Sequence, residues 1–197
     1  MKKYLLLIIA ALAIFGVSAQ DLSKSELKKI EKEAKKQAQA YIKEGWKTLP
    51  GKPSIQMQQE KAVKMSYEKN ASGEDKYIMQ PGQASGQTYN AARLGAIQGA
   101  KMELANSLGQ TYFGNMTNDL SNDGVLDISV EEVKSEVKSI IDQKLGKIIT
   151  VSEMYQQSGP KKFVVAVMVA YNSEEAEMIA KEAAREVLKR ETQNLGK

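Results

Sequence analysis

The stretch that decides the fold is KIITVSEMYQQSGPKKFVVAVMVAY, residues 147–171. Its two halves, Lys147 to Gln157 and Lys161 to Tyr171, have the pattern of a β-hairpin that turns at Ser158-Gly159-Pro160. The second half is apolar on both alternating faces. This is typical of a strand inside a sheet with cover on each side, or of a strand with one face reserved for another subunit. Self-association of the chain is therefore one expectation.

Helical patterns flank the hairpin. Upstream, Ser129 with Glu132 begins a predicted helix that ends at Gly146, with the apolar stripe Val130, Val133, Val137, Ile140, Ile141 and Leu145. Downstream, Asn172 with Glu175 begins the last predicted helix, whose inward residues are Ala176, Ile179, Ala180, Ala183, Val187 and Leu188. A loose tail is expected from Thr192 onward.

A helix crowded with alanine and glycine is predicted from Thr88 to Gly109. Small residues let a helix approach its neighbour closely, so we expect this helix to lie centrally on the sheet. Its larger apolar residues, expected on one inward side, are Leu94, Ile97, Leu104 and Leu108. The oxygen-rich stretch 111–127 lacks the spacing of a calcium loop, and we expect a helix end and a solvated turn there.

Two further helices are predicted before the first strand. The first covers 22–46, begins at Ser23 with Glu26, ends near Gly45, and has the stripe Leu27, Ile30, Ala34, Tyr41, Ile42 and Trp46. The second covers 54–69, with Ile55, Gln59, Ala62, Val63 and Met65 facing inward. A strand at 76–86, interrupted by Pro81-Gly82, is expected at the sheet edge because proline cannot donate to the ladder.

These patterns predict an α+β fold. It comprises a small antiparallel sheet with the central alanine- and glycine-rich helix and the C-terminal helix packed on it, plus an N-terminal helical arm. The predicted divisions are a signal peptide at 1–19, the arm at 20–70, the α+β domain at 71–191 and a tail at 192–197.

The first nineteen residues have the pattern of an export signal. Lys2 and Lys3 precede an apolar run at 5–15, and Val17-Ser18-Ala19 forms a small-x-small cleavage site, so the mature chain is expected to begin at Gln20. We therefore expect a protein of the periplasm or cell envelope. The chain has no cysteine to carry a lipid anchor.

The amino-acid composition excludes several classes of catalytic and metal site. With no histidine and no cysteine, the chain cannot form a Ser-His-Asp or Cys-His catalytic system or the usual zinc, haem and iron–sulfur sites. We expect no catalytic, cofactor-binding or metal site, and no enzyme. The alternative that stays open is a carboxylate-dependent hydrolase of an envelope polymer, using Glu103 with Asp119 or Glu132. Without Lys2 and Lys3, 26 basic residues face 24 acidic ones, and no nucleic-acid partner is expected.

The predicted first helix carries the one candidate interaction surface, formed by Lys28, Lys32, Lys35 and Lys36. A basic amphipathic helix of this kind can bind an anionic membrane surface or an acidic partner. The alternative is an ordinary solvated face, because Glu31, Glu33 and Glu44 dilute the charge.

Three local sequences support a resemblance to known envelope proteins. They are Tyr89-Asn90-Ala91-Ala92-Arg93, then Gly146-Lys147-Ile148-Ile149-Thr150-Val151, and Ala170-Tyr171-Asn172 at the end of the valine-rich strand. Together they resemble the LPP-twenty type of outer-membrane lipoprotein, whose fold is similar to the N-terminal domain of the flagellar T protein, over roughly residues 76 to 190.

The chain also resembles a group of uncharacterised exported proteins of Gram-negative bacteria that share the lysine-rich first helix closing on Glu44-Gly45-Trp46-Lys47. The lipidation cysteine of the lipoproteins is missing here, so membrane anchoring is not carried over. The resemblance implies a small α+β envelope domain that works through contacts with an envelope protein or with itself rather than through turnover.

Overall fold

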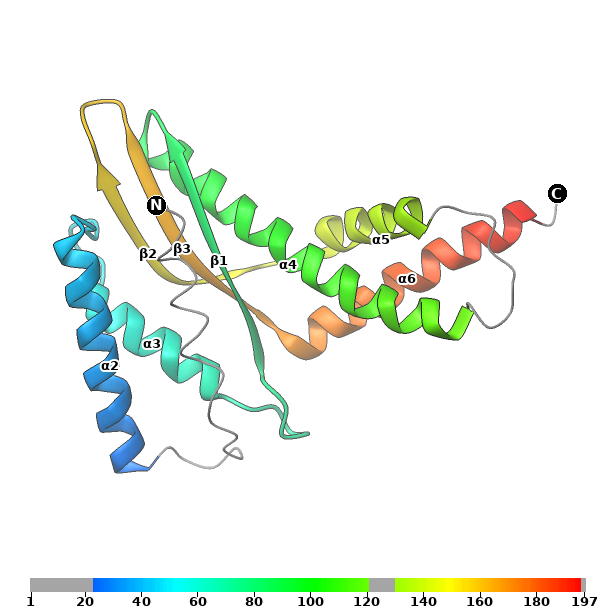
Figure 1. Ribbon diagram of the computed structural model, residues 1–197, viewed down its shortest axis with the longest axis horizontal. Coiled ribbons are helices and arrows are strands. Elements are labelled where there is room, and N and C mark those ends of the chain that lie inside the picture. Colours follow the sequence, from blue (N-terminus) through cyan, green and yellow to red (C-terminus); the bar gives the residue numbers. More distant parts are fainter. Residues whose placement is uncertain (1–22, 121–129, 196–197) are drawn as a thin grey trace. The chain divides into compact units, whose positions relative to one another are not determined.

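The computed structural model describes residues 23–120 and 130–195 (Figure 1). Within these ranges the chain forms five helices and three strands of an antiparallel sheet, which confirms the predicted α+β class. In chain order they are α2 (Lys24–Lys43), α3 (Ile55–Tyr67), β1 (Tyr77–Gly86), α4 (Tyr89–Leu120), α5 (Val130–Lys144), β2 (Ile149–Gln157), β3 (Phe163–Asn172) and α6 (Ser173–Leu195). The predicted signal peptide and the predicted cap at Ser129 lie outside the described residues.

The sheet has the strand order β1-β3-β2, with β3 in the centre (Figure 1). Strands β2 and β3 pair antiparallel from Gln157 opposite Phe163, and the Ser158 N–H donates to the Lys162 carbonyl at 3.0 Å across the turn. The predicted hairpin is therefore confirmed. Seven consecutive β3 residues, 165–171, are buried within the single chain. Of the two explanations for its apolar faces, cover on both sides is the one that the fold provides, and self-association stays a prediction.

Helices α2 and α3 cover one face of the sheet. Their buried side chains meet the sheet in two clusters: Ala38, Trp46, Ile55, Met154 and Ala166 in the first, and Ala62, Met65, Val151, Met168 and Ala170 in the second. The described residues up to Ala100, together with 149–170, form one compact unit. The described part of the predicted arm thus shares a unit with the sheet, because α3 packs directly on β1 and β2.

The first half of α4 lies against β1 with almost no space between the backbones. A Cβ built on Gly82 would stand 2.0 Å from the Ala96 carbonyl oxygen and 2.8 Å from the Ala100 Cβ. This confirms that the small residues of α4 allow a close approach to the sheet. The predicted interruption at Pro81-Gly82 is wrong, since β1 is continuous from Tyr77 to Gly86. Because β1 is an edge strand, it accommodates the proline without a break.

The inward faces of two helices differ from the prediction. Leu27, Ile42 and Leu94 are exposed by 39%, 60% and 64%, although all three were expected inside. On α2 the predicted Ile30 and Ala34 are buried together with Ala38, and on α4 Ala92, Ala96 and Ala100 are buried. On α4 the physical reason is the short distance between its backbone and that of β1, which leaves room for a methyl group but not for a leucine side chain.

A second compact unit contains α4 from Lys101 onward, α5 and α6. Helix α4 runs on through residues 110–120, past the predicted end at Gly109, and stops at Leu120, inside the 111–127 stretch where a helix end was expected; α6 runs on through residues 192–195. Neither stretch contains a proline that would stop a helix. The α5 stripe is confirmed for Val133, Val137, Ile140, Ile141 and Leu145, whereas the Val130 side chain lies outside the described residues.

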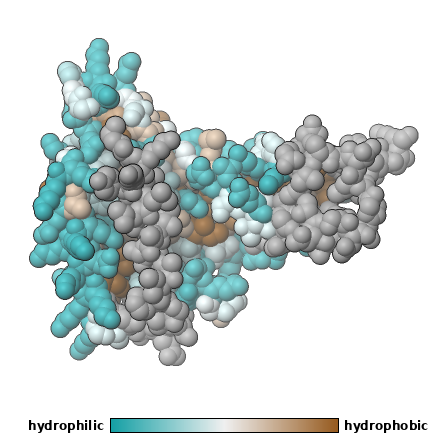
Figure 2. All heavy atoms as spheres, viewed as in Figure 1, coloured by the Kyte–Doolittle hydropathy of each residue, from teal (hydrophilic) through white to brown (hydrophobic). Residues whose placement is uncertain are grey.

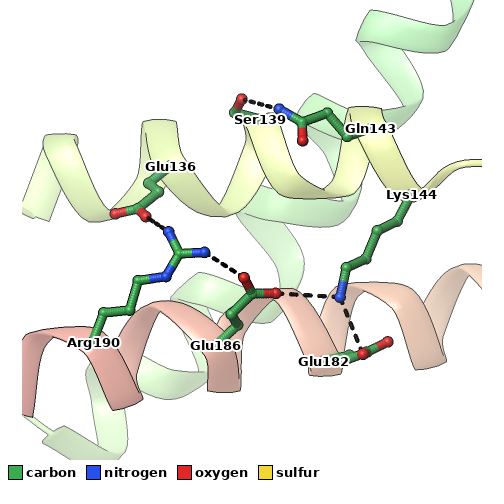
Figure 3. Close-up of polar contacts among 7 residues, drawn as sticks. All are labelled: Glu136, Ser139, Gln143, Lys144, Glu182, Glu186 and Arg190. Atoms are coloured by element: carbon green, nitrogen blue, oxygen red, sulfur yellow. Dashed lines mark hydrogen bonds and ion pairs between the residues drawn. The ribbon is translucent and has the colours of Figure 1, made fainter.

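Helix α6 packs against α5 within this second unit. The Asn172 side chain accepts from the Glu175 N–H at 3.0 Å, as the cap prediction required. Two cations connect the helices: Lys144 lies between Glu182 and Glu186, and Arg190 lies between Glu136 and Glu186 (Figure 3). Each exposed pair of this kind contributes little to stability.

Candidate functional site

The candidate interaction surface lies on α2, which the tertiary structure holds firmly at its C-terminal end. Gly45 follows the helix with a φ of +87°, a conformation that suits glycine, and turns the chain toward the sheet. Lys47 then exchanges two backbone hydrogen bonds of 2.8 Å with Tyr155 at the edge of β2, and the Gln156 side chain donates to the Glu44 carbonyl at 2.7 Å. The helix is thereby fixed to the sheet edge.

The inner face of α2 is fully occupied. Ile30, Ala34 and Ala38 are buried, and the Tyr41 and Trp46 rings meet edge to face with centroids 6.5 Å apart. Burial, followed by the negative charge of Glu44, raises the pKa of the Tyr41 hydroxyl to about 12. Because α3 and the sheet cover this apolar face, it cannot also enter a membrane while the fold is intact.

The four lysines predicted as an interaction surface, Lys28, Lys32, Lys35 and Lys36, are all exposed on α2. The helix carries three more, Lys24, Lys29 and Lys43, and all seven are exposed. At about 100° per residue, the seven fall within one arc of about 140° on the side away from the buried alanines. We call this arc the lysine face.

Acidic residues lie outside the lysine face. Glu31 stands about 20° beyond one border and Glu33 about 40° beyond the other, so neither interrupts the arc. Glu44 follows the last residue of the helix. No lysine of α2 forms an ion pair with any side chain that the structure describes. The acidic residues of this segment therefore flank the lysine face, with Glu31 and Glu33 four residues from Lys35 and Lys29 at its borders. Figure 2 shows hydrophilic side chains over the region that α2 occupies in Figure 1.

A second polar cluster lies on the opposite face of the sheet, around Glu153 of β2. Its carboxylate accepts a hydrogen bond from the Tyr89 hydroxyl and another from the Arg93 Nε at 2.9 Å, both from the first turns of α4. Its backbone N–H donates to the buried Gln58 side chain of α3. The Glu153 side chain is 14% exposed, and it connects α4 to the sheet.

The electrostatics of Glu153 fit a structural role. Burial raises the pKa of this carboxyl group, and the positive charge of Lys52 lowers it by less. The carboxylate already accepts from Tyr89 and Arg93, so its oxygens are engaged by the protein itself. Next to it, the Tyr89 and Tyr155 rings pack edge to face with centroids 5.6 Å apart. The cluster stabilises the contact between α4 and β2.

Sequence reasoning missed Glu153, Tyr89, Arg93 and Gln58 as a group. One signal was present: Tyr89 and Arg93 are four residues apart at the start of a helix, a spacing that puts both on one side. Their partner comes from a strand 60 residues further along, and that pairing has no local signature.

The residues of the hydrolase alternative are not brought together by the described structure. Glu103 is exposed on α4, whereas the side chains of Asp119 and Glu132 lie outside the described residues. Within the described ranges, no three acidic side chains are grouped as a cation site would require. None of the helices described in these ranges combines the length and the apolar character that a membrane span needs.

Comparison with known proteins gives no match: no protein family, curated protein or solved structure is significantly similar to this chain.

Proposed function

We propose that this protein is an exported, non-catalytic component of a bacterial cell envelope that acts by contact, and that the lysine face of α2 is its contact surface. The observation that carries this proposal is the lysine face itself, with seven exposed lysines on one side of a helix that is fastened to the fold.

The charge pattern supports a binding role more than a merely solvated one. A solvated helix surface gains stability from alternating charges of opposite sign, because oppositely charged side chains three or four residues apart attract each other. The borders of the lysine face have such opposite charges, Glu31 and Glu33, but its middle places like charges at those spacings, as in Lys28, Lys32 and Lys36. Their mutual repulsion is relieved when an anionic partner covers them.

Export and envelope location are proposed from the predicted signal peptide and from the resemblance to exported proteins of Gram-negative bacteria. The local sequences of that resemblance take part in structural contacts: Tyr89 and Arg93 bind Glu153, and the Gly146 N–H donates to the Tyr171 hydroxyl at 3.3 Å. Residues used in this way are consistent with a domain that works through packing and contact.

The test is photo-crosslinking in intact envelopes. A photoreactive residue replaces Gln39, an exposed residue within the lysine face, or Ser135, an exposed residue of α5 as the matched control position. We expect adducts from position 39 that disappear when Lys28, Lys32, Lys35 and Lys36 are changed to glutamine, and no such dependence at position 135. Adducts at position 39 that are unaffected by the four substitutions would refute the proposal, as would their absence.

A further inference from the structure

The lysine face is long, and lysine is its most frequent residue, with six of the seven lysines between Lys24 and Lys36. Its seven lysines run from Lys24 to Lys43, a helix of about 30 Å at 1.5 Å per residue. The same arc also contains three exposed residues that are not lysine, namely Ser25, Gln39 and Ile42. It contains no arginine and no aromatic residue. A partner of this face must therefore be recognised by charge spread over a broad area.

This composition disfavours a protein partner. Protein interfaces are enriched in tyrosine, tryptophan and arginine, which act as anchors in pockets, and are depleted in lysine. Arginine also matches fixed carboxylate geometry in a bidentate manner, whereas lysine presents a mobile point charge on a flexible stem. Flexible point charges suit a partner whose negative groups are themselves mobile and spread over a surface, as lipid headgroup phosphates are.

The packing of α2 against the sheet determines how this helix can attach to a lipid surface. An interfacial amphipathic helix ordinarily places its apolar side among the acyl chains. Here that side, with Ile30, Ala34 and Ala38, is buried against the protein's own core. Attachment by insertion would require α2 to leave the sheet, while attachment through the lysine face leaves the fold unchanged.

From these observations we propose that the lysine face binds the surface of an anionic phospholipid layer by electrostatic contact alone, without insertion. This inference rests on the proposed function and names its partner. Binding of this kind depends on the negative charge of the lipid and weakens with salt, because the Debye length falls from about 10 Å at 0.1 M to about 3 Å at 1 M.

The test is co-sedimentation of the full chain with vesicles. The vesicles contain either phosphatidylcholine mixed with phosphatidylglycerol, which is anionic, or phosphatidylcholine alone. We expect binding to the mixed vesicles at 0.1 M salt, loss of binding at 1 M salt, and none to phosphatidylcholine. Each lysine near an anionic surface contributes about fivefold in affinity, so changing Lys28, Lys32, Lys35 and Lys36 to glutamine should weaken binding several hundred-fold, to order of magnitude.

A matched control keeps this comparison specific. Lys61, Lys64, Lys161 and Lys162 are exposed in the same compact unit, and changing them to glutamine alters the net charge by the same amount. This control should retain binding within about fivefold. All variants share residues 1–22, so any contribution of that segment cancels. We expect both variants to fold, because all eight substitutions are at exposed positions. Far-ultraviolet circular dichroism checks this.

Two results would overturn the lipid inference: no binding of the parent chain to anionic vesicles, or equal losses in the two quadruple variants. If the parent chain does not bind anionic vesicles but the position-39 adducts still depend on the four lysines, the partner is an acidic macromolecule and the proposed function stands. If the position-39 adducts are also absent, or do not depend on the four lysines, both proposals are wrong.

Discussion

Replacing Gly82 with alanine should strongly destabilise the unit that contains the sheet. The added Cβ would stand 2.0 Å from the Ala96 carbonyl oxygen, whereas a normal carbon–oxygen contact is about 3.3 Å. Strand β1 and helix α4 must therefore separate by roughly 1.3 Å. The obstacle is backbone, so no change of side-chain rotamer relieves it.

The expected cost is at least about 3 kcal/mol. Overpacked cores typically lose about 1–3 kcal/mol, and a gap of 0.5–1 Å already forfeits a quarter to a half of the dispersion energy of the separated surfaces. Here the separated surfaces include the buried Ala92, Ala96 and Ala100. Against a typical total stability of about 5–15 kcal/mol, such a loss is large.

Gly99→Ala is the matched control, since it is the same substitution on the helix that Gly82 approaches. A Cβ built on Gly99 meets no atom within 4 Å. Alanine in a helix interior is more favourable than glycine by about 0.5–1 kcal/mol, so this variant should be more stable than the parent. The two substitutions are thus expected to have opposite signs.

The assay is urea denaturation, followed by circular dichroism and by the fluorescence of Trp46. This residue is the one tryptophan of the chain, and it is buried in the same compact unit as Gly82. A Gly82→Ala variant within about 1 kcal/mol of the parent would refute the close approach of α4 to β1. Equal destabilisation by Gly99→Ala would refute the geometry that separates the two positions.

Three further outcomes are expected. Arg93→Met should lower the free energy of unfolding by about 1–3 kcal/mol, because it leaves the largely buried Glu153 carboxylate without one of its donors. Adding Glu153→Gln should recover part of this loss in a double-mutant cycle measured by urea unfolding. Tyr41 has its pKa raised from 10.0 to about 12 in the folded state, so the unfolded state loses its proton first and stability should fall between pH 10 and 12. Partial exposure limits this loss to about 1–2 kcal/mol, and Tyr41→Phe should abolish it when unfolding is measured across that range. Leu104→Ala should cost about 2–5 kcal/mol and Leu94→Ala less than about 0.5 kcal/mol, and equal thermal shifts would contradict the assigned inner face of α4.

The sequence was sufficient where the signal is local. The hairpin at 147–171 has two strand patterns and a turn within 25 residues, and the observed β2 and β3 follow it closely. The helices at 22–46 and 54–69 were also predicted to within a few residues, because caps, breakers and apolar spacing act over one or two turns. The lysines of the candidate surface were likewise visible, since they lie on the side opposite the apolar stripe.

Tertiary structure alone decided what depends on residues distant in sequence. It placed alanines on the inner side of α4 and left Leu94 exposed, because the short distance between the backbones of α4 and β1 determines which side chain fits. It joined Glu153 to Tyr89 and Arg93, and it grouped the chain into two compact units that meet within α4, before β2 and within β3. Periodicity shows that a helix has an apolar side. Which apolar residues are buried depends on the neighbour that covers them, and that neighbour is not encoded within the same segment.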